Sequence, residues 1–312
     1  MNSYYATFPA GCYDIIVKHL KSFKLDEFKI AARDDSSVLF ESSLPIEKLI
    51  ELRYFTNVYF VVDDAKPLPK SLLKGKYFRL MLLKEGAPQS IQQDEKEEFK
   101  TKIKQTYKLE PNTHLSKNDF YLIERKSGKK LLTLRFPKAK FKREKLSAGE
   151  LRPELAHILC LAAGVKAKHV LLDMFAGYGS IPYEAVRGFG CRNVTAVDIK
   201  RLPGRHEYPA IEWQEADARN LDHVQDNSID RVVTDPPWGI YDAEVDDLSS
   251  LYKDFTEEMT RTLRPGGVAV VLSGFEEAAE YFEGAKTLQL INKWNVLVSG
   301  KKATIYKLQK TR

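Results

Sequence analysis

Several residue types and patterns are scarce in this 312-residue chain, and each scarcity excludes a class of protein. No run approaches about 18 consecutive apolar residues, so no membrane-spanning helix is expected. The opening residues lack a basic stretch followed by an apolar one, and we therefore expect no secretory signal. The three cysteines and six histidines are scattered without metal-ligand spacing, which predicts reduced thiols in a cytoplasmic protein and no metal site.

Positive charge is abundant in the first half of the chain. The formal net charge of +6 divides into +9 for residues 1–150 and −3 for residues 151–312. Clustered positive charge attracts nucleic acid by releasing counterions, although a lysine run is as often only a solvated face. A phosphate-binding surface is predicted at the basic residues around 125–145, namely Lys126, Lys129, Lys130, Arg135, Lys138, Lys140, Lys142 and Arg143.

The organisation along the chain predicts two small α+β units followed by a larger α/β unit. Residues 1–65 read as a β-α-β-β-α-β-like unit that ends near Pro67. Residues 66–137 form a second unit, in which Ser127-Gly128 indicates a hairpin between two strands. Residues 138–150 read as a basic linker, and the last unit is predicted at 151–312.

From residue 151 onward, strand-like and helix-like segments alternate, which predicts a doubly wound parallel sheet. Strands are expected at 170–174, 194–197, 211–215, 229–233 and 268–273. The runs at 294–298 and 304–308 flank the turn Ser299-Gly300-Lys301-Lys302. We therefore expect a terminal hairpin whose last strand runs antiparallel to its neighbours.

A glycine-rich motif follows the first of these strands and opens a helix. In an open α/β sheet the ligand binds at the carboxyl ends of the strands. A lone G-x-G fits NAD, FAD, other nucleotides or S-adenosylmethionine, but Pro182 stands where a dinucleotide fingerprint has its third glycine. That substitution disfavours a nicotinamide dehydrogenase. The candidate cofactor-binding residues of the motif are Asp173, Phe175, Ala176, Gly177 and Gly179.

Aspartates recur after the strands that follow. Asp198, Asp217 and Asp235 continue the series from Asp173 at intervals of 25, 19 and 18 residues, each about one strand-helix unit. A single aspartate at such a position is commonly a helix cap, whereas four at successive strand ends predict a cofactor site. Asp198 suits the ribose hydroxyls, and Asp217 with Ala218 suits the edge of an adenine ring.

The fourth aspartate opens the sequence Asp235-Pro236-Pro237-Trp238. Two prolines stiffen the backbone and remove two N–H donors, which leaves a ledge of acceptors beside a flat indole. A Pro-rich turn is the ordinary explanation of Pro-Pro alone. At the end of the fourth strand, however, the ledge suits a planar amino group on a nucleobase, and these four residues are the candidate catalytic residues.

Together these motifs resemble the class I S-adenosylmethionine-dependent methyltransferases that methylate amino groups. The segments 149–156 and 181–185 resemble those around the glycine motif of THUMP-containing RNA methyltransferases, and the tetrad with Gly239 is similar to that of tRNA guanine-N2 methyltransferases. The resemblance implies a Rossmann-like, seven-stranded methyltransferase sheet, preceded by ferredoxin-like and THUMP-like regions. It implies S-adenosylmethionine as cofactor, tRNA as partner and the N2 amino group of guanine as target.

Three departures and three alternatives accompany this resemblance. Met174 replaces a common proline, Tyr178 replaces a serine within the glycine motif, and Trp238 stands where tyrosine or phenylalanine is commoner. The alternative substrates are guanine N2 in ribosomal RNA and adenine N6 in RNA or DNA. A third alternative is an RNA-binding protein whose cofactor fold no longer catalyses. A monomer without a metal and without a membrane partner is expected, and the sequence does not indicate which proteins, if any, it binds.

Overall fold

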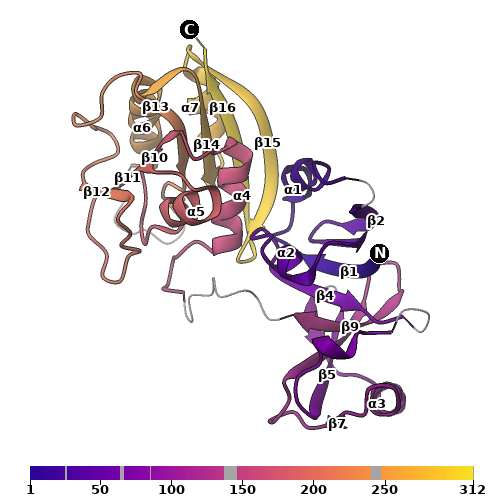
Figure 1. Cartoon of the computed structure of the whole chain (residues 1–312). Coiled ribbons are helices and arrows are strands. Elements are labelled where there is room, and N and C mark those ends of the chain that lie inside the picture. Colours follow the sequence, from indigo (N-terminus) through magenta and orange to yellow (C-terminus); the bar gives the residue numbers. More distant parts are fainter. Residues whose placement is uncertain (25–26, 64–66, 85, 137–145, 240–246, 312) are drawn as a thin grey trace. The chain divides into compact units, whose positions relative to one another are not determined.

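The computed structural model describes residues 1–24, 27–63, 67–84, 86–136, 146–239 and 247–311. The chain divides into two compact units (Figure 1). The N-terminal unit comprises Met1–Phe8 and Leu20–Lys142, and the C-terminal unit comprises Pro9–His19 and Arg143–Arg312. Among the described residues, no helix combines the length and the apolar character needed to cross a lipid bilayer.

A nine-stranded sheet forms the N-terminal unit, in the order β2-β3-β1-β4-β9-β8-β5-β6 with β7 beside β5. Its strands are β1 (Asn2–Thr7), β2 (Phe28–Asp34), β3 (Ser37–Ser42), β4 (Asn57–Val61), β5 (Tyr77–Lys84), β6 (Ala87–Gln89), β7 (Glu110–Pro111), β8 (Asn118–Glu124) and β9 (Lys130–Phe136). Its helical segments are α2 (Ile46–Ile50), a 3-10 turn (Lys70–Leu72) and α3 (Gln93–Tyr107). The antiparallel pairing of β4 with β9 joins the two predicted small units in one sheet. Their assignment as ferredoxin-like (1–65) and THUMP-like (66–137) domains stays a prediction.

The C-terminal unit contains a seven-stranded sheet in the order β12-β11-β10-β13-β14-β16-β15. The strands are β10 (Val170–Asp173), β11 (Asn193–Asp198), β12 (Ile211–Glu215), β13 (Ile229–Thr234), β14 (Leu263–Ser273), β15 (Leu288–Val298) and β16 (Lys301–Lys310). The first five strands are parallel, and β16 runs antiparallel to β14 and β15. The predicted parallel sheet and antiparallel terminal hairpin are therefore confirmed.

Helices cover both faces of this sheet. They are α4 (Pro153–Ala163), α5 (Ser180–Phe189), α6 (Leu248–Thr262) and α7 (Ala278–Gly284), and Figure 1 shows α4 and α5 on one side with α6 and α7 behind. Helix α6 presents Leu251, Phe255 and Met259 at four-residue intervals, and all three are buried in the core. Its first turn is capped by Asp247, whose side chain accepts a hydrogen bond from the Ser250 N–H at 2.9 Å.

The segment Pro9–His19 belongs to the C-terminal unit although it lies near the start of the chain. It contains most of helix α1 (Tyr13–Leu20). The Leu297 N–H of β15 donates to the Ala10 carbonyl at 3.3 Å, and a side chain at Gly11 would collide with the Asn295 carbonyl. Deleting the N-terminal half of the chain would therefore also remove part of the C-terminal unit.

Several short or edge elements are weakly marked in the sequence, among them β2, β6, β7, the 3-10 turn and α7. Strand β2 alternates exposed and half-buried residues such as Lys29 and Arg33 because it lies at the edge of its sheet. Helix α7 spans only seven residues, too few for a reliable apolar period. The three cysteines are buried and form no disulfide, as the sequence predicts.

Candidate cofactor and substrate site

The carboxyl ends of four neighbouring parallel strands carry the aspartate series. Asp173 ends β10 and Asp198 ends β11, while Asp217 lies two residues beyond β12 and Asp235 directly follows β13. Because β12, β11, β10 and β13 are adjacent and parallel, these strand ends share one edge of the sheet. The glycine loop and the Pro-Pro ledge leave the sheet at the same edge. The topology therefore places both predicted sites side by side within the C-terminal unit.

Asp173 is the most deeply buried member of the series, with 1% of its surface exposed. Its Oδ1 atom accepts hydrogen bonds from the Thr234 hydroxyl at 2.7 Å and the Phe175 N–H at 3.2 Å. Its Oδ2 atom is buried without a hydrogen-bond partner among the described residues. Burial raises the pKa of Asp173 to about 8, and the nearby carboxylates of Asp235 and Asp198 act in the same direction.

The glycine loop folds back onto the second aspartate. The Gly177 N–H donates to Asp198 Oδ2 at 2.7 Å, and the Ala176 N–H donates to the Val197 carbonyl at 2.8 Å. Gly179 has a φ of 86° and caps helix α5, and a Cβ there would lie 2.8 Å from the Trp213 ring. Only glycine meets both requirements, so the second glycine of the motif has a structural reason.

Asp217 and Ala218 occupy different surroundings from the rest of the site. The Asp217 carboxylate receives the Arg219 guanidinium through Nη2 at 2.6 Å and Nε at 3.0 Å, which lowers its pKa. Ala218 is buried in the core of the sheet. The carboxylate thus sits at the predicted strand end but is already engaged by a neighbouring cation, whereas Asp173 lies close to Asp198 and Asp235.

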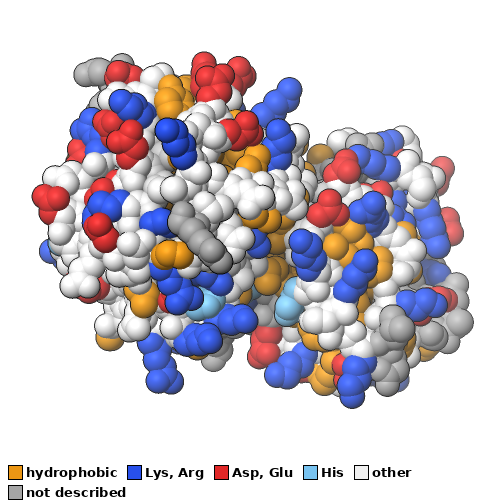
Figure 2. Space-filling model, turned by 90° about the horizontal axis from the view of Figure 1, so that it is seen from above, with side chains coloured by type: hydrophobic (Ala, Val, Ile, Leu, Met, Phe, Trp, Pro, Cys, Tyr) orange, Lys and Arg blue, Asp and Glu red, His pale blue; other side chains and the backbone are white. Residues whose placement is uncertain are grey.

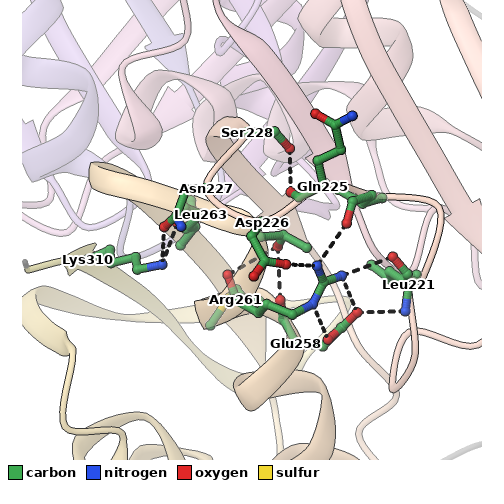
Figure 3. A network of polar contacts seen from close by, with 12 residues as sticks. Leu221, Gln225, Asp226, Asn227, Ser228, Glu258, Arg261, Leu263 and Lys310 are labelled. Carbon is green, nitrogen blue, oxygen red and sulfur yellow. Dashed lines mark hydrogen bonds and ion pairs between the residues drawn. The ribbon is translucent and has the colours of Figure 1, made fainter.

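The loop that carries Asp217 is anchored by two residues of helix α6 (Figure 3). Glu258 Oε1 accepts a hydrogen bond from the Leu221 N–H at 2.7 Å, and Arg261 Nη2 donates to the Leu221 carbonyl at 3.0 Å. Arg261 also binds Glu258 directly and contacts Asp226. Both polar groups of the Leu221 backbone are therefore satisfied by one ion pair.

Breaking this anchor should destabilise the C-terminal unit. Arg261→Met leaves Glu258 without its charged partner, and the expected loss is about 2 kcal/mol of unfolding free energy at pH 7. Arg261 lowers the pKa of Glu258, so this stabilisation is present above the unfolded-state pKa of about 4.3 and is lost as pH falls through the lower folded-state value. Urea denaturation at pH 7 and pH 3.5 measures the effect.

The control for that experiment is Lys253→Met, which removes an exposed cation from the same helix. It should leave the urea midpoint nearly unchanged. An Arg261→Met variant with wild-type stability at pH 7, or one whose destabilisation is undiminished at pH 3.5, would contradict the anchoring role.

The Pro-Pro ledge is held in a defined geometry. The Trp238 indole N–H donates to Asp235 Oδ1 at 2.9 Å, and the Tyr252 hydroxyl lies 3.2 Å from the Pro237 carbonyl, to which it donates. Pro236 is buried, whereas Asp235 and Trp238 are half-buried. The ledge thus brings the Asp235 carboxylate and the Trp238 ring together at the sheet edge.

The predicted RNA-binding residues that the structure describes lie on the β8–β9 hairpin of the N-terminal unit and are mostly ion-paired. Lys126 binds Asp35 at 2.9 Å, Lys130 binds Glu95 at 2.5 Å and Arg135 binds Asp119 at 2.6 Å. Lys129 is exposed near the turn. Figure 2 shows basic and acidic side chains interspersed over most of one face. Lys138, Lys140, Lys142 and Arg143 lie outside the described residues.

Some residues of the site carry no recognisable signal in the sequence. Thr234 is fully buried and links Asp173 to the Phe175 N–H, which it binds at 3.1 Å. In the sequence, Tyr252 is one more residue of the buried stripe of α6. Only the structure shows that its hydroxyl contacts the ledge. Ile199, directly after Asp198, is 65% exposed, an unusual position for a large aliphatic side chain.

Comparisons with known proteins agree with this geometry. Residues 207–303 match the family described as RMKL-like, methyltransferase domain. TrmN from Thermus thermophilus superposes with a TM-score of 0.80 and 21% identity over 99% of this chain and 100% of that chain. A possible methylase from Clostridium difficile 630 superposes with a TM-score of 0.71 and 16% identity over 99% and 98%. The C-terminal unit has the class I methyltransferase fold. The predicted Rossmann-like fold is thereby confirmed.

Two curated relatives align with part of the chain. The tRNA (guanine(10)-N2)-dimethyltransferase of Methanothermobacter thermautotrophicus is 34% identical over 128 residues, which cover 38% of this chain and 37% of the relative. The tRNA (guanine(6)-N2)-methyltransferase of Thermus thermophilus is 33% identical over 151 residues, which cover 46% and 43%. The matched region thus spans less than half of the length of either relative.

Proposed function

We propose that the protein transfers a methyl group from S-adenosylmethionine to the exocyclic N2 amino group of a guanine in tRNA. The observation that carries the proposal is the Asp235–Trp238 ledge, which leaves the sheet at the same edge as the glycine loop and Asp198. The names of the two curated relatives, both tRNA guanine-N2 methyltransferases, support the choice of substrate.

The residues at this edge fit S-adenosylmethionine. Asp173 Oδ2, which has no hydrogen-bond partner in the described part of the chain, is a buried acceptor that a cationic amino group would satisfy. A Cβ at Gly177 would meet nothing within 4 Å, so the loop leaves room beside its backbone. Asp198 would bind ribose hydroxyls, and the exposed Ile199 offers an apolar surface to the adenine ring. A similar fold was solved as a putative methyltransferase, SMU.472, complexed with SAH.

The chemistry required of the protein is to orient a weak nucleophile. When bound, S-adenosylmethionine supplies an electrophilic methyl group on a sulfonium. The amino nitrogen of guanine is unreactive because its lone pair is delocalised into the ring. Acceptors at Asp235 and the Pro236 carbonyl would take its two N–H bonds, so that the lone pair points toward the methyl group. Asp235 also stabilises the ammonium as it forms, and can accept its proton.

The target base must leave its stack before it can reach the ledge. Extruding a paired base costs roughly a few kcal/mol. Stacking on Trp238, worth about 1–3 kcal/mol, and backbone contacts from the basic N-terminal half would offset that cost. The THUMP-like region would hold the acceptor end of tRNA.

The decisive experiment incubates the full-length protein with total tRNA and isotopically labelled S-adenosylmethionine, then identifies the nucleoside by mass spectrometry. N2-methylguanosine or N2,N2-dimethylguanosine in tRNA supports the proposal. Label confined to ribosomal RNA, or to N6-methyladenine, selects an alternative substrate. If calorimetry detects no binding of S-adenosylmethionine, the result would instead favour a non-catalytic RNA-binding protein.

The role of the basic segment yields a separate prediction. Replacing Lys138, Lys140, Lys142 and Arg143 together by serine should weaken tRNA binding. The slope of log K against log salt should fall by about one for each phosphate that the variant no longer neutralises. Filter binding at several salt concentrations measures the slope. The matched control removes Lys126 and Lys130, whose partners are Asp35 and Glu95, and should change the slope less. Equal slopes in all three proteins would refute a role for the segment.

These substitutions are preferable to deleting residues 1–145. The deletion would test the same idea, but it would also remove Pro9–His19, which belong to the C-terminal unit. An inactive deletion variant would then reflect damage to the catalytic unit as much as weaker RNA binding.

A further inference from the structure

Three contacts fix Trp238 and the ledge that carries it, two of them on the ring and one on the backbone. The indole N–H donates to Asp235 Oδ1 at 2.9 Å across the two intervening prolines. Because those prolines have restricted φ angles, the backbone between the two side chains is stiff, and the hydrogen bond couples the direction of the ring to that of the carboxylate. Phenylalanine has no donor, and the tyrosine hydroxyl lies at the far end of its ring. Among tryptophan, tyrosine and phenylalanine, only the indole carries an N–H at this position.

The second fixed point is Gly274, directly after β14. A Cβ at Gly274 would lie 2.7 Å from Trp238 Cδ2 and 3.1 Å from Cζ3, and it would also collide with Cε3. These atoms all belong to the six-membered ring of the indole, so the ring packs on the glycine backbone. Any side chain at Gly274 would push the indole away from its present place.

The third fixed point lies beneath the ledge. The Tyr252 hydroxyl contacts the Ser273 hydroxyl at 2.6 Å and the Pro237 carbonyl at 3.2 Å. Tyr252 is fully buried, and its pKa is raised by burial, so it remains a protonated donor over the physiological range. The end of β14 thus supports both the backbone of the ledge and the ring of Trp238.

We propose that Trp238 is a positioning residue whose indole N–H holds the Asp235 carboxylate in the orientation needed for methyl transfer. The indole ring itself is held in place by packing on Gly274. The proposal rests on the proposed function. A carboxylate on a free side chain samples several rotamers, whereas this one is held on one oxygen before the substrate arrives. The face of the ring can still stack on a base, while the N–H at its edge donates to Asp235, which tyrosine and phenylalanine cannot do at this position.

The test compares Trp238→Phe with the wild-type chain. Phenylalanine keeps an aromatic face, although a smaller one, and loses the donor, so kcat for tRNA methylation should fall about 10- to 100-fold. KM for tRNA and the dissociation constant of S-adenosylmethionine should change less than about threefold. Gly274→Ala should reproduce the fall in kcat with the tryptophan still present, because its methyl group displaces the ring. The control is Trp294→Phe on β15, which should keep wild-type kcat.

Nuclear magnetic resonance provides a readout that does not depend on activity. The chain has three tryptophans, Trp213, Trp238 and Trp294, so three indole N–H signals are expected. In Asp235→Ala the Trp238 signal should shift toward that of a water-exposed indole, while the other two stay in place.

Two results would overturn the proposal. One is a Trp238→Phe enzyme as fast as wild type or faster, which would mean that the indole contact is a resting position that breaks before reaction. The other is a Trp238 indole N–H signal whose chemical shift is the same in Asp235→Ala as in the wild type. If the wild-type protein methylates no RNA, the proposed function fails instead, and the resonance experiment still decides whether the contact exists.

Discussion

Asp235→Ala is expected to lower the rate of methyl transfer to tRNA by about 10²–10³-fold while S-adenosylmethionine still binds. The reason is that Asp235 is the charged acceptor of the ledge, and its removal leaves the amino group without orientation and without a partner for the developing positive charge. Single-turnover kinetics with labelled cofactor measure the chemical step, and calorimetry measures cofactor binding.

Asp235→Asn serves as the graded comparison for that variant. Asparagine keeps one carbonyl oxygen that can accept the Trp238 N–H, so it should lose less activity than alanine. Asp222→Ala, at an exposed position of the same unit, should behave as wild type. Methylation by Asp235→Ala at the wild-type rate would exclude the ledge as the catalytic element.

Asp173→Asn is expected to stabilise the cofactor-free protein at pH 8 by on the order of 3–5 kcal/mol and to weaken cofactor binding. The folded-state pKa of about 8 lies above the ordinary value because the side chain is fully buried. Below about pH 4 the Asp173 carboxyl is protonated in both the folded and the unfolded state, so it does not lower the free energy of unfolding. As pH rises from about 4 to 8 the unfolded chain ionises first, so stability falls over this window and then levels off.

The asparagine side chain keeps an oxygen for the Thr234 hydroxyl and the Phe175 N–H, so the fold should survive the change. Urea denaturation at pH 5, 6.5 and 8 should give a smaller pH dependence in the variant than in the wild type. The affinity of the wild type for S-adenosylmethionine should rise toward pH 8, because the cationic groups of the cofactor favour an ionised Asp173. The affinity of the variant should not change with pH. Parallel pH curves for the two proteins would refute this account.

Predictions about the C-terminal unit succeed where one residue class repeats at a fixed interval. The buried run Val268–Leu272 and the turn at Ser299-Gly300 predict a central strand and an antiparallel hairpin, because those signals are local. Strand-end positions of Asp173, Asp198 and Asp235 follow from the same alternation. In the N-terminal unit the edge strand β2 has no such pattern, because exposed and half-buried residues alternate along it, although it pairs antiparallel with the next strand, β3.

The pairing of charged side chains, by contrast, could not be predicted from the sequence. The sequence places Lys126, Lys130 and Arg135 in one basic segment, yet each meets an acidic side chain from another element: Asp35 after β2, Glu95 in α3 and Asp119 in β8. A count of charges along the chain cannot reveal such pairing, because it depends on which side chains the sheet brings within about 4 Å.

The sequence by itself determined the fold class of the C-terminal unit, the order of its strands along the chain and the chemical character of the ledge. These features depend on local periodicity and on residues such as Pro236 and Pro237, whose backbone limits hold in any context. Only the tertiary structure decided that Pro9–His19 join the C-terminal unit, that Thr234 holds Asp173, and that Gly274 and Tyr252 support Trp238 and its ledge. Those contacts join residues far apart in the chain, and packing in three dimensions selects them.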